Sequence, residues 1–290
     1  MMTVDADGGC PLCSGVVVAG RLASPLGTMV WCRACGLLYR GSRQPEDGAP
    51  CDAAFALEER IGKRRRPHFQ RFLARAGRPG KLLDVGCGYG FFLQLAREAG
   101  WDAVGVDVDR RAVEYARSQL HVDARAGDIR DLRFPDGSFD VVTLWNVLEL
   151  VPQPLPLLHE VRRTLVPGGR VFVRTQNAAW HRVNFALTRF LRHVGGRAIF
   201  DKHPYLTYFF GLNSFSRSTL RHALERAGFP RIRIDNSRPI RGDPYAGTRP
   251  PVEFFLGLTK HVVHGTVQTI AVASAGQWLL GPSIEAWGGR

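Results

Sequence analysis

One short stretch of the chain constrains its fold more than any other. The apolar run Leu82–Val85 passes directly into three glycines at alternate positions, and an amphipathic run over residues 91–99 follows at once. A strand, a glycine loop and a helix in that order bring the backbone of α/β proteins against a nucleotide-like ligand, because glycine has no Cβ and lets the chain turn sharply. The spacing G-x-G-x-G differs from the G-x-G-x-x-G of dinucleotide folds and from phosphate loops that end in Gly-Lys-Ser/Thr.

Strand-like and helix-like runs alternate after this point. The expected strands are 81–85, 103–106, 122–126, 139–144, 170–174, 231–235 and 283–287. The expected helices are 53–75, interrupted near Pro67, and 91–99, 110–119, 155–165 and 216–227. Pro167-Gly168-Gly169 is expected as a turn into the fifth strand. Such alternation predicts a parallel sheet covered by helices on both faces.

Four of the six cysteines form a second motif with the spacing C-x2-C-x18-C-x2-C. They are Cys10, Cys13, Cys32 and Cys35. This spacing falls in the range of structural zinc sites, because each two-residue gap lets both thiolates face one tetrahedral metal. Four thiolates close the coordination sphere, so the metal would be structural and not catalytic. Two disulfides and redox chemistry are the alternatives, and a cytosolic location disfavours the disulfides.

These features together predict the domain organisation. We expect a zinc ribbon at 1–40, a linker and leading helix at 41–79, and an α/β domain at 80–290. The fold class is α/β: a Rossmann-like, doubly wound seven-stranded sheet with the ribbon in front and a helical, aromatic insertion after strand five. The insertion covers 177–215 and is interpreted as a substrate lid, with a helical subdomain whose aromatic residues are core as the alternative.

The apolar segment 252–280 near the end of the chain carries an uncharged stretch. Because no Asp, Glu, Lys or Arg lies between Lys260 and Glu285, we consider a membrane span, an interfacial helix pair and an ordinary packed helix. The polar residues within the stretch argue against a span. We expect a cytoplasmic protein, with peripheral contact at the inner membrane face through 252–280 as an open alternative, since no secretory leader opens the sequence.

The net charge of +13 comes almost wholly from arginine. A polyanionic partner such as RNA is one explanation of this charge, and the base composition of the genome is another. Composition does not define the oligomeric state.

Four motifs in register resemble those of class I S-adenosylmethionine-dependent methyltransferases, over roughly residues 80–235. Asp84-Val85-Gly86-Cys87-Gly88-Tyr89-Gly90 resembles the first motif. Val104-Gly105-Val106-Asp107 resembles the second-strand motif, and Gly127-Asp128-Ile129 the third. Phe139 through Gly169 resembles the fourth strand, its helix and the Pro-Gly-Gly turn. The cysteine module in front resembles the zinc-binding heads of methyltransferases that modify sugars and other small molecules.

The resemblance implies a set of cofactor residues. The cofactor loop would comprise Asp84, Gly86, Cys87, Gly88 and Gly90. Asp107 would hold the ribose hydroxyls, Val108 would pack against the adenine, and Asp128 and Ile129 would hold the adenine edge and face. Asn146 would line the methionine end. Many relatives carry His after the segment Asn146–Glu149, but Leu150 stands here, so a role for that His does not transfer.

The resemblance implies S-adenosylmethionine-dependent methyl transfer, for which an oxygen or carbon nucleophile usually needs a base. His203 is the candidate catalytic base, with His181 and Tyr205 as weaker candidates and a structural role as the alternative for each. The expected acceptor is a small molecule, a sugar or a lipid-linked glycan. An RNA methyltransferase and a non-catalytic module that binds S-adenosylmethionine remain as alternatives.

Overall fold

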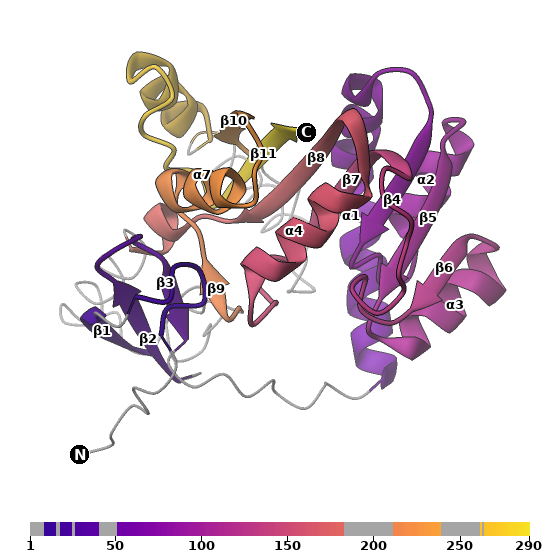
Figure 1. Cartoon of the computed structure of the whole chain (residues 1–290), viewed down its shortest axis with the longest axis horizontal. Helices are drawn as coiled ribbons and strands as arrows, with labels where there is room; N and C mark the ends of the chain where they lie inside the picture. Colours follow the sequence, from indigo (N-terminus) through magenta and orange to yellow (C-terminus); the bar gives the residue numbers. More distant parts are fainter. Residues whose placement is uncertain are drawn as a thin grey trace.

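The computed structural model describes residues 9–15, 18–24, 27–40, 51–182, 211–238, 262 and 264–290. A seven-stranded sheet in the order β10-β11-β8-β7-β4-β5-β6 forms its centre (Figure 1). The strands are β4 (Lys81–Val85), β5 (Asp102–Asp107), β6 (Asp123–Ala126), β7 (Phe139–Trp145), β8 (Leu165–Gln176), β10 (Arg231–Asn236) and β11 (Ser283–Gly289). β11 runs antiparallel to both neighbours, and the other pairs are parallel. The predicted α/β class with seven strands is confirmed.

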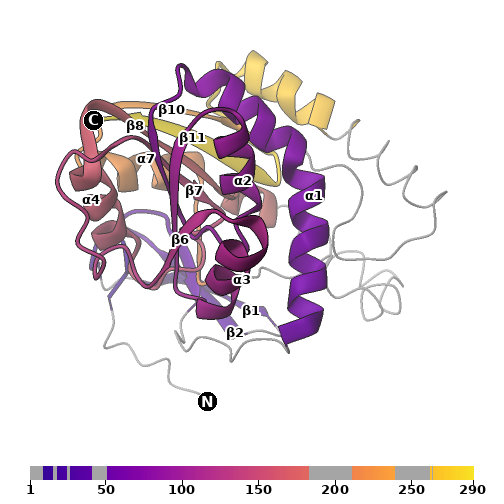
Figure 2. The same cartoon turned by 90° about the vertical axis from the view of Figure 1, so that its right-hand side faces the viewer.

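Helices cover both faces of this sheet. They are α1 (Cys51–Ala76), α2 (Phe91–Glu98), α3 (Arg110–Leu120), α4 (Pro154–Thr164) and α7 (Arg217–Arg226). Alternate strand residues point to opposite faces. Leu82 packs in the apolar cluster with residues of α1, α2 and α3, whereas its neighbour Leu83 packs in the cluster with α4 and α7. Figure 2 shows α1, α2 and α3 together on one side of the sheet.

Two elements differ from the sequence prediction. α1 continues through Pro67 without a break over 26 residues, because Phe69 and Phe72 on its next turn pack against Trp145 and hold it on the sheet. β8 begins at Leu165 and takes in the expected Pro-Gly-Gly turn, with a register shift against β7 and a positive φ of 82° at Gly168.

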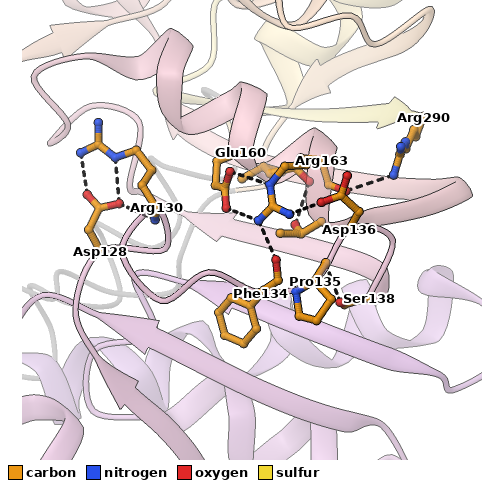
Figure 3. A network of polar contacts seen from close by, with 11 residues as sticks. Asp128, Arg130, Phe134, Pro135, Asp136, Ser138, Glu160, Arg163 and Arg290 are labelled. Carbon is orange, nitrogen blue, oxygen red and sulfur yellow. Dashed lines mark hydrogen bonds and ion pairs between the residues drawn. The ribbon is translucent and has the colours of Figure 1, made fainter.

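A polar network ties the loop before β7 to the end of α4 (Figure 3). The Arg163 guanidinium donates to the Glu160 carboxylate at 2.9 and 2.6 Å, to the Phe134 carbonyl at 2.6 Å, and to Asp136. Arg290, the final residue, donates to the Arg163 carbonyl at 3.1 Å. This network lies at the edge where β7 and β8 begin, so it braces the end of the sheet away from the glycine loop.

The N-terminal module forms a second, antiparallel sheet in the order β1-β2-β3-β9. Its strands are β1 (Val18–Ser24), β2 (Gly27–Cys32), β3 (Leu38–Arg40) and β9 (Asn213–Ser214). The small N-terminal sheet is therefore present as expected. Its fourth strand comes from the far end of the insertion, more than 170 residues along the chain, which the sequence did not indicate.

Much of the insertion, residues 183–210 with His203 and Tyr205, lies outside the described residues, as does 239–261. In the tail, residues 264–273 are helical, with Val267 and Ala271 buried and Val272 exposed. Within the described ranges, no helix has the length and apolar character needed to cross a membrane.

Candidate cofactor site and metal centre

A cavity of about 680 Å³ opens at the carboxyl ends of β4, β5, β6 and β7. It lies where the strand order reverses between β4 and β7, the place where open α/β sheets bind their ligands. All the expected cofactor residues line it except Gly90. A second hollow at the opposite edge, lined by Lys81 and Asp102 among others, contains none of them.

The glycines of the loop serve different purposes. Gly88 has a φ of 50°, and a Cβ built there meets no atom within 4 Å, so the backbone at this point faces open space in the cavity. A Cβ at Gly86 would lie 2.4 Å from Val147, and one at Gly90 would lie 2.9 Å from Ala116, so these two glycines permit close packing. The N-cap residue of α2 is Gly90, so no side chain at this position caps the first N–H groups of the helix.

Two carboxylates lie under this loop, the half-buried Asp107 and the buried Asp84. Asp107 accepts hydrogen bonds from the Gly88 N–H at 2.7 Å and the Asp109 N–H at 2.9 Å, and burial raises its pKa. Asp84 accepts one from the Thr143 hydroxyl at 2.6 Å, and burial raises its pKa to about 8. Cys87 is buried beside both acids, and burial and the two acids raise its pKa, so its thiol is packed and not reactive.

The residues expected around the adenine differ in what they present. Val108 is 73% exposed and lines the cavity, so it presents an apolar surface there. Ile129 is fully buried in the core below. Both oxygens of Asp128 accept hydrogen bonds from the Arg130 guanidinium, at 2.9 and 2.6 Å, and this arginine lowers the pKa of Asp128. A ligand at Asp128 would therefore share the carboxylate with Arg130 (Figure 3).

Sequence reasoning missed a buried polar network at the end of β7. Asn146, which has a φ of 61°, donates from Nδ2 to Glu149 Oε1 at 2.7 Å and accepts from Arg174. Glu149 is 1% exposed, and its second oxygen accepts from the Thr175 hydroxyl at 2.8 Å. These partners fix Asn146 at the cavity mouth. The pattern could not be read beforehand, because Arg174 and Thr175 come from the next strand.

Trp145 is a second residue that the sequence reasoning missed. It lines the cavity and is 7% exposed, and its buried indole N–H finds no hydrogen-bond acceptor among the residues that the structure describes. Buried polar groups are normally paired. The Trp145 N–H is therefore an exception to that rule within the described part of the chain.

Of the candidate bases, only His181 lies in the described chain. Its Nε2 lies 3.0 Å from the Gln176 Oε1, and Gln176 lines the cavity. Burial lowers the pKa of His181 to about 4, so the ring is neutral at neutral pH and a weak base. The nearby cavity wall is apolar, with Val151, Leu157 and the 56% exposed Leu150.

The four cysteines of the ribbon converge on one point. Their sulfur atoms all lie within 4.8 Å of one another, and the Cys10–Cys35 and Cys13–Cys32 pairs are each 3.5 Å apart. All four are free thiols. A tetrahedral zinc ion with Zn–S bonds of about 2.3 Å needs sulfurs roughly 3.8 Å apart, so the donor set and spacing fit this metal.

Two matching turns build the cluster. The Ser14 N–H donates to the Cys10 carbonyl at 2.8 Å, and the Gly36 N–H donates to the Cys32 carbonyl at 2.9 Å. Ser14 and Gly36 take the positive φ of each turn. Gly15 is needed for another reason, because a Cβ there would lie 3.2 Å from the Cys13 sulfur.

The fold and the cavity define a class: an α/β protein with a nucleotide-type cofactor site at the switch point of a seven-stranded sheet. A family model described as a methyltransferase domain matches residues 57–232, and the chain belongs to this family. The family resemblance expected from the motifs is therefore confirmed.

Curated relatives match a shorter region. The ubiquinone biosynthesis O-methyltransferase of Xanthomonas campestris pv. campestris is 37% identical over 111 residues, which cover 36% of this chain and 46% of the relative. The protein of the same name from Pseudomonas paraeruginosa is 36% identical over 110 residues, 36% of this chain and 47% of the relative. The match thus spans about half the length of these relatives.

Solved structures share the fold at lower identity. A methyltransferase of Haloferax volcanii, in complex with the Trm112 methyltransferase activator, superposes with a TM-score of 0.55 at 20% identity over 82% of this chain and 94% of its own. A SAM-dependent methyltransferase from Archaeoglobus fulgidus gives a TM-score of 0.51 at 19% identity over 82% of this chain and 100% of its own.

Proposed function

We propose that this protein transfers a methyl group from S-adenosylmethionine to a small-molecule acceptor with an apolar part. The main support for this proposal is the cavity at the switch point, which is lined by motif residues expected to bind the cofactor. Family membership and the O-methyltransferase activity for which the ubiquinone biosynthesis relatives are named support the same reaction.

The residues of the cavity fit such a cofactor. Gly88 offers open space above its backbone, Asp107 offers a carboxylate for ribose hydroxyls, and Val108 offers an apolar surface for the adenine. When bound, S-adenosylmethionine supplies an activated methyl group on a sulfonium.

The contribution of the chain itself is alignment and the exclusion of water. Asn146 is held at the mouth of the cavity by Glu149 and Arg174, so the wall beside the methionine end is rigid. Proximity and orientation alone are worth about 7–11 kcal/mol in well-aligned reactions. We propose His203 as the base, and this residue lies outside the described ranges. The low pKa of His181 makes it a weak base at neutral pH, so it is the poorer candidate.

The acceptor side favours a ligand with apolar surface. Leu150 is exposed to the cavity at the position where many relatives carry His, and Val151, Pro152 and Leu157 extend the same wall. Burial of such surface yields roughly 25 cal/mol per Å². A lipophilic ring or chain on the acceptor is therefore the best complement. We also propose that the four-cysteine cluster binds a structural zinc ion, because its donor set fits that metal.

The test is one incubation of the purified protein with methyl-labelled S-adenosylmethionine and cell extract. The products are separated into small-molecule, lipid, RNA and protein fractions. We expect label in the small-molecule or lipid fraction, and none with heat-inactivated protein. Label confined to RNA would overturn the proposed acceptor class, and cofactor binding without any transfer would overturn methyl transfer.

A further inference from the structure

The two ends of the insertion meet in a small group of residues that we call the neck. The neck comprises Asn177, Ala178 and Leu212–Phe215. The Ala178 N–H donates to the Phe215 carbonyl at 3.0 Å, and Asn177 forms a β-bridge with Phe215. The Asn177 amide is fully buried and donates to the carbonyls of Leu279 and Gly281 at 2.8 and 2.7 Å.

The neck backs one wall of the cofactor cavity. The Glu149 carbonyl accepts hydrogen bonds from the N–H groups of Leu212 at 2.6 Å and Asn213 at 3.0 Å. The Asn213 side chain, 1% exposed, donates to the Val151 carbonyl at 2.6 Å. Glu149 through Pro152 all line the cavity, so the position of the neck sets the position of this wall.

The ribbon holds the neck from the other side. β3 pairs with β9 through Leu38 with Ser214 and Tyr39 with Asn213, and the Arg40 N–H donates to the Leu212 carbonyl at 2.8 Å. The same two residues, Leu212 and Asn213, therefore bond to the ribbon and to the cavity wall.

The ribbon itself is docked on α7. Leu12 and Leu37, which are buried, pack in the same apolar cluster as Leu220 and Leu224 of that helix. The Arg226 guanidinium donates to the Leu12 carbonyl at 2.6 Å. Figure 1 shows the ribbon sheet, which includes β9, beside α7.

From this geometry we infer that the ribbon is a clamp: its four-cysteine fold fixes the neck, and the neck fixes the acceptor wall Glu149–Pro152. The name "acceptor wall" rests on the proposed function, whereas the clamp itself rests on the contacts. β9 has only two residues, too few to stay paired without a stable partner sheet. A module as small as the ribbon depends on its metal for stability. Metal loss should therefore loosen the neck.

The glycine loop should be insensitive to this change. It follows β4 and hydrogen-bonds to Asp107 at the end of β5, and neither strand pairs with the ribbon. The cavity thus has two halves: a cofactor half carried by the central sheet, and an acceptor half whose order depends on the ribbon.

Amide hydrogen exchange of the full chain tests the clamp without an identified acceptor. Cys10→Ser removes one thiolate of the cluster, Asn213→Ala removes the bond to Val151 and leaves all four cysteines, and Cys51→Ser is the matched control. Zinc content is measured for each variant, and S-adenosylhomocysteine binding is measured by calorimetry.

We expect exchange over 211–216 to rise by roughly tenfold or more in Cys10→Ser and not in Cys51→Ser. Exchange over 149–151 should rise in both Cys10→Ser and Asn213→Ala, because each loses the support that the clamp gives to this wall. Exchange over 84–90 and the affinity for S-adenosylhomocysteine should stay within about twofold of wild type. Unchanged exchange over 211–216 in zinc-free Cys10→Ser, or equal loosening of 84–90, would overturn the clamp. If Cys10→Ser does not fold, the same comparison of wild type with and without a zinc chelator decides in its place. Failure of the wild type to bind S-adenosylhomocysteine would instead overturn the proposed function.

Discussion

Asp107 is the residue whose substitution most directly tests the cofactor site. Its carboxylate holds the Gly88 N–H at 2.7 Å and also faces the cavity. Replacing it with Asn keeps the size and one acceptor oxygen but removes the charge. Hydrogen bonds to a charged group contribute about 1.5–3 kcal/mol each. We therefore expect Asp107→Asn to weaken S-adenosylhomocysteine binding by about 10- to 100-fold in calorimetric titration.

Asp123→Asn is the matched control, because Asp123 lies on the neighbouring strand with its side chain 53% exposed and outside the cavity. Both variants should retain the circular dichroism spectrum of the wild type. Equal affinities in Asp107→Asn and Asp123→Asn would remove Asp107 from the ribose site.

Single residues show where the sequence is a sufficient guide. The positions of Asp84, Asp107 and Asn146 at the cavity followed from the motifs that resemble those of class I methyltransferases. The contacts of Asp128 with Arg130 and of Asn146 with Glu149 and Arg174 did not, because side-chain pairing depends on rotamers and on strands that are neighbours only in the fold. The orphan Trp145 N–H likewise becomes visible only when its surroundings are known.

At the scale of elements, two glycines near the loop predict different consequences of the same substitution. A Cβ at Gly105 of β5 would lie 2.3 Å from Leu93 of α2 and 2.7 Å from the Cys87 sulfur, whereas a Cβ at Gly88 meets nothing within 4 Å. We expect Gly105→Ala to lower the free energy of unfolding by about 1–3 kcal/mol through overpacking. Gly88→Ala should cost about 1–2 kcal/mol for its positive φ and, by filling ligand space, should weaken S-adenosylhomocysteine binding at least about tenfold.

Urea unfolding and calorimetry of both variants measure the two effects, and each variant serves as the other's control. A Gly88→Ala variant with wild-type affinity would show that no ligand approaches the loop there. A Gly105→Ala variant as stable as wild type would show that α2 can shift away from β5.

The elements also show what local sequence can specify. Apart from the early start of β8, the strands and helices of the central domain begin and end close to the predicted residues, because periodic apolar runs, the Asp109 cap of α3 and the Ser216 cap of α7 are local signals. Pro67 was expected to interrupt α1, but aromatic packing on the next turn overrides it. β9 has two residues and exists through pairing with β3, so no local pattern could reveal it.

In the whole molecule, the motif residues lie at one edge of the central sheet, and the smaller ribbon sheet contacts the same region through β9. The sequence predicted the two sheets as separate units at 1–40 and 80–290. Their connection through β9 depends on contacts between residues about 174 positions apart, such as Tyr39 and Asn213, which composition and spacing do not record.

The free energy of unfolding should depend on pH because of Asp84, the buried acid beneath the glycine loop. Asp84 is 2% exposed, and burial raises its pKa from 3.8 to about 8. Between these values the folded chain binds a proton at Asp84 that the unfolded chain has released, so this residue's contribution to stability is present at low pH and is lost as pH rises towards 8. The slope for one such group is at most about 1.4 kcal/mol per pH unit.

Asp84→Asn removes the titration and keeps an oxygen for the Thr143 hydroxyl. Urea unfolding of both proteins without cofactor, at pH 5 and pH 7.5, isolates the effect as a double difference that cancels the other titrating groups. We expect the wild type to lose at least about 1 kcal/mol more than Asp84→Asn over this interval. Parallel losses in the two proteins would show that Asp84 is ionised in the folded chain throughout, and that water or a nearby donor, not burial, governs its charge.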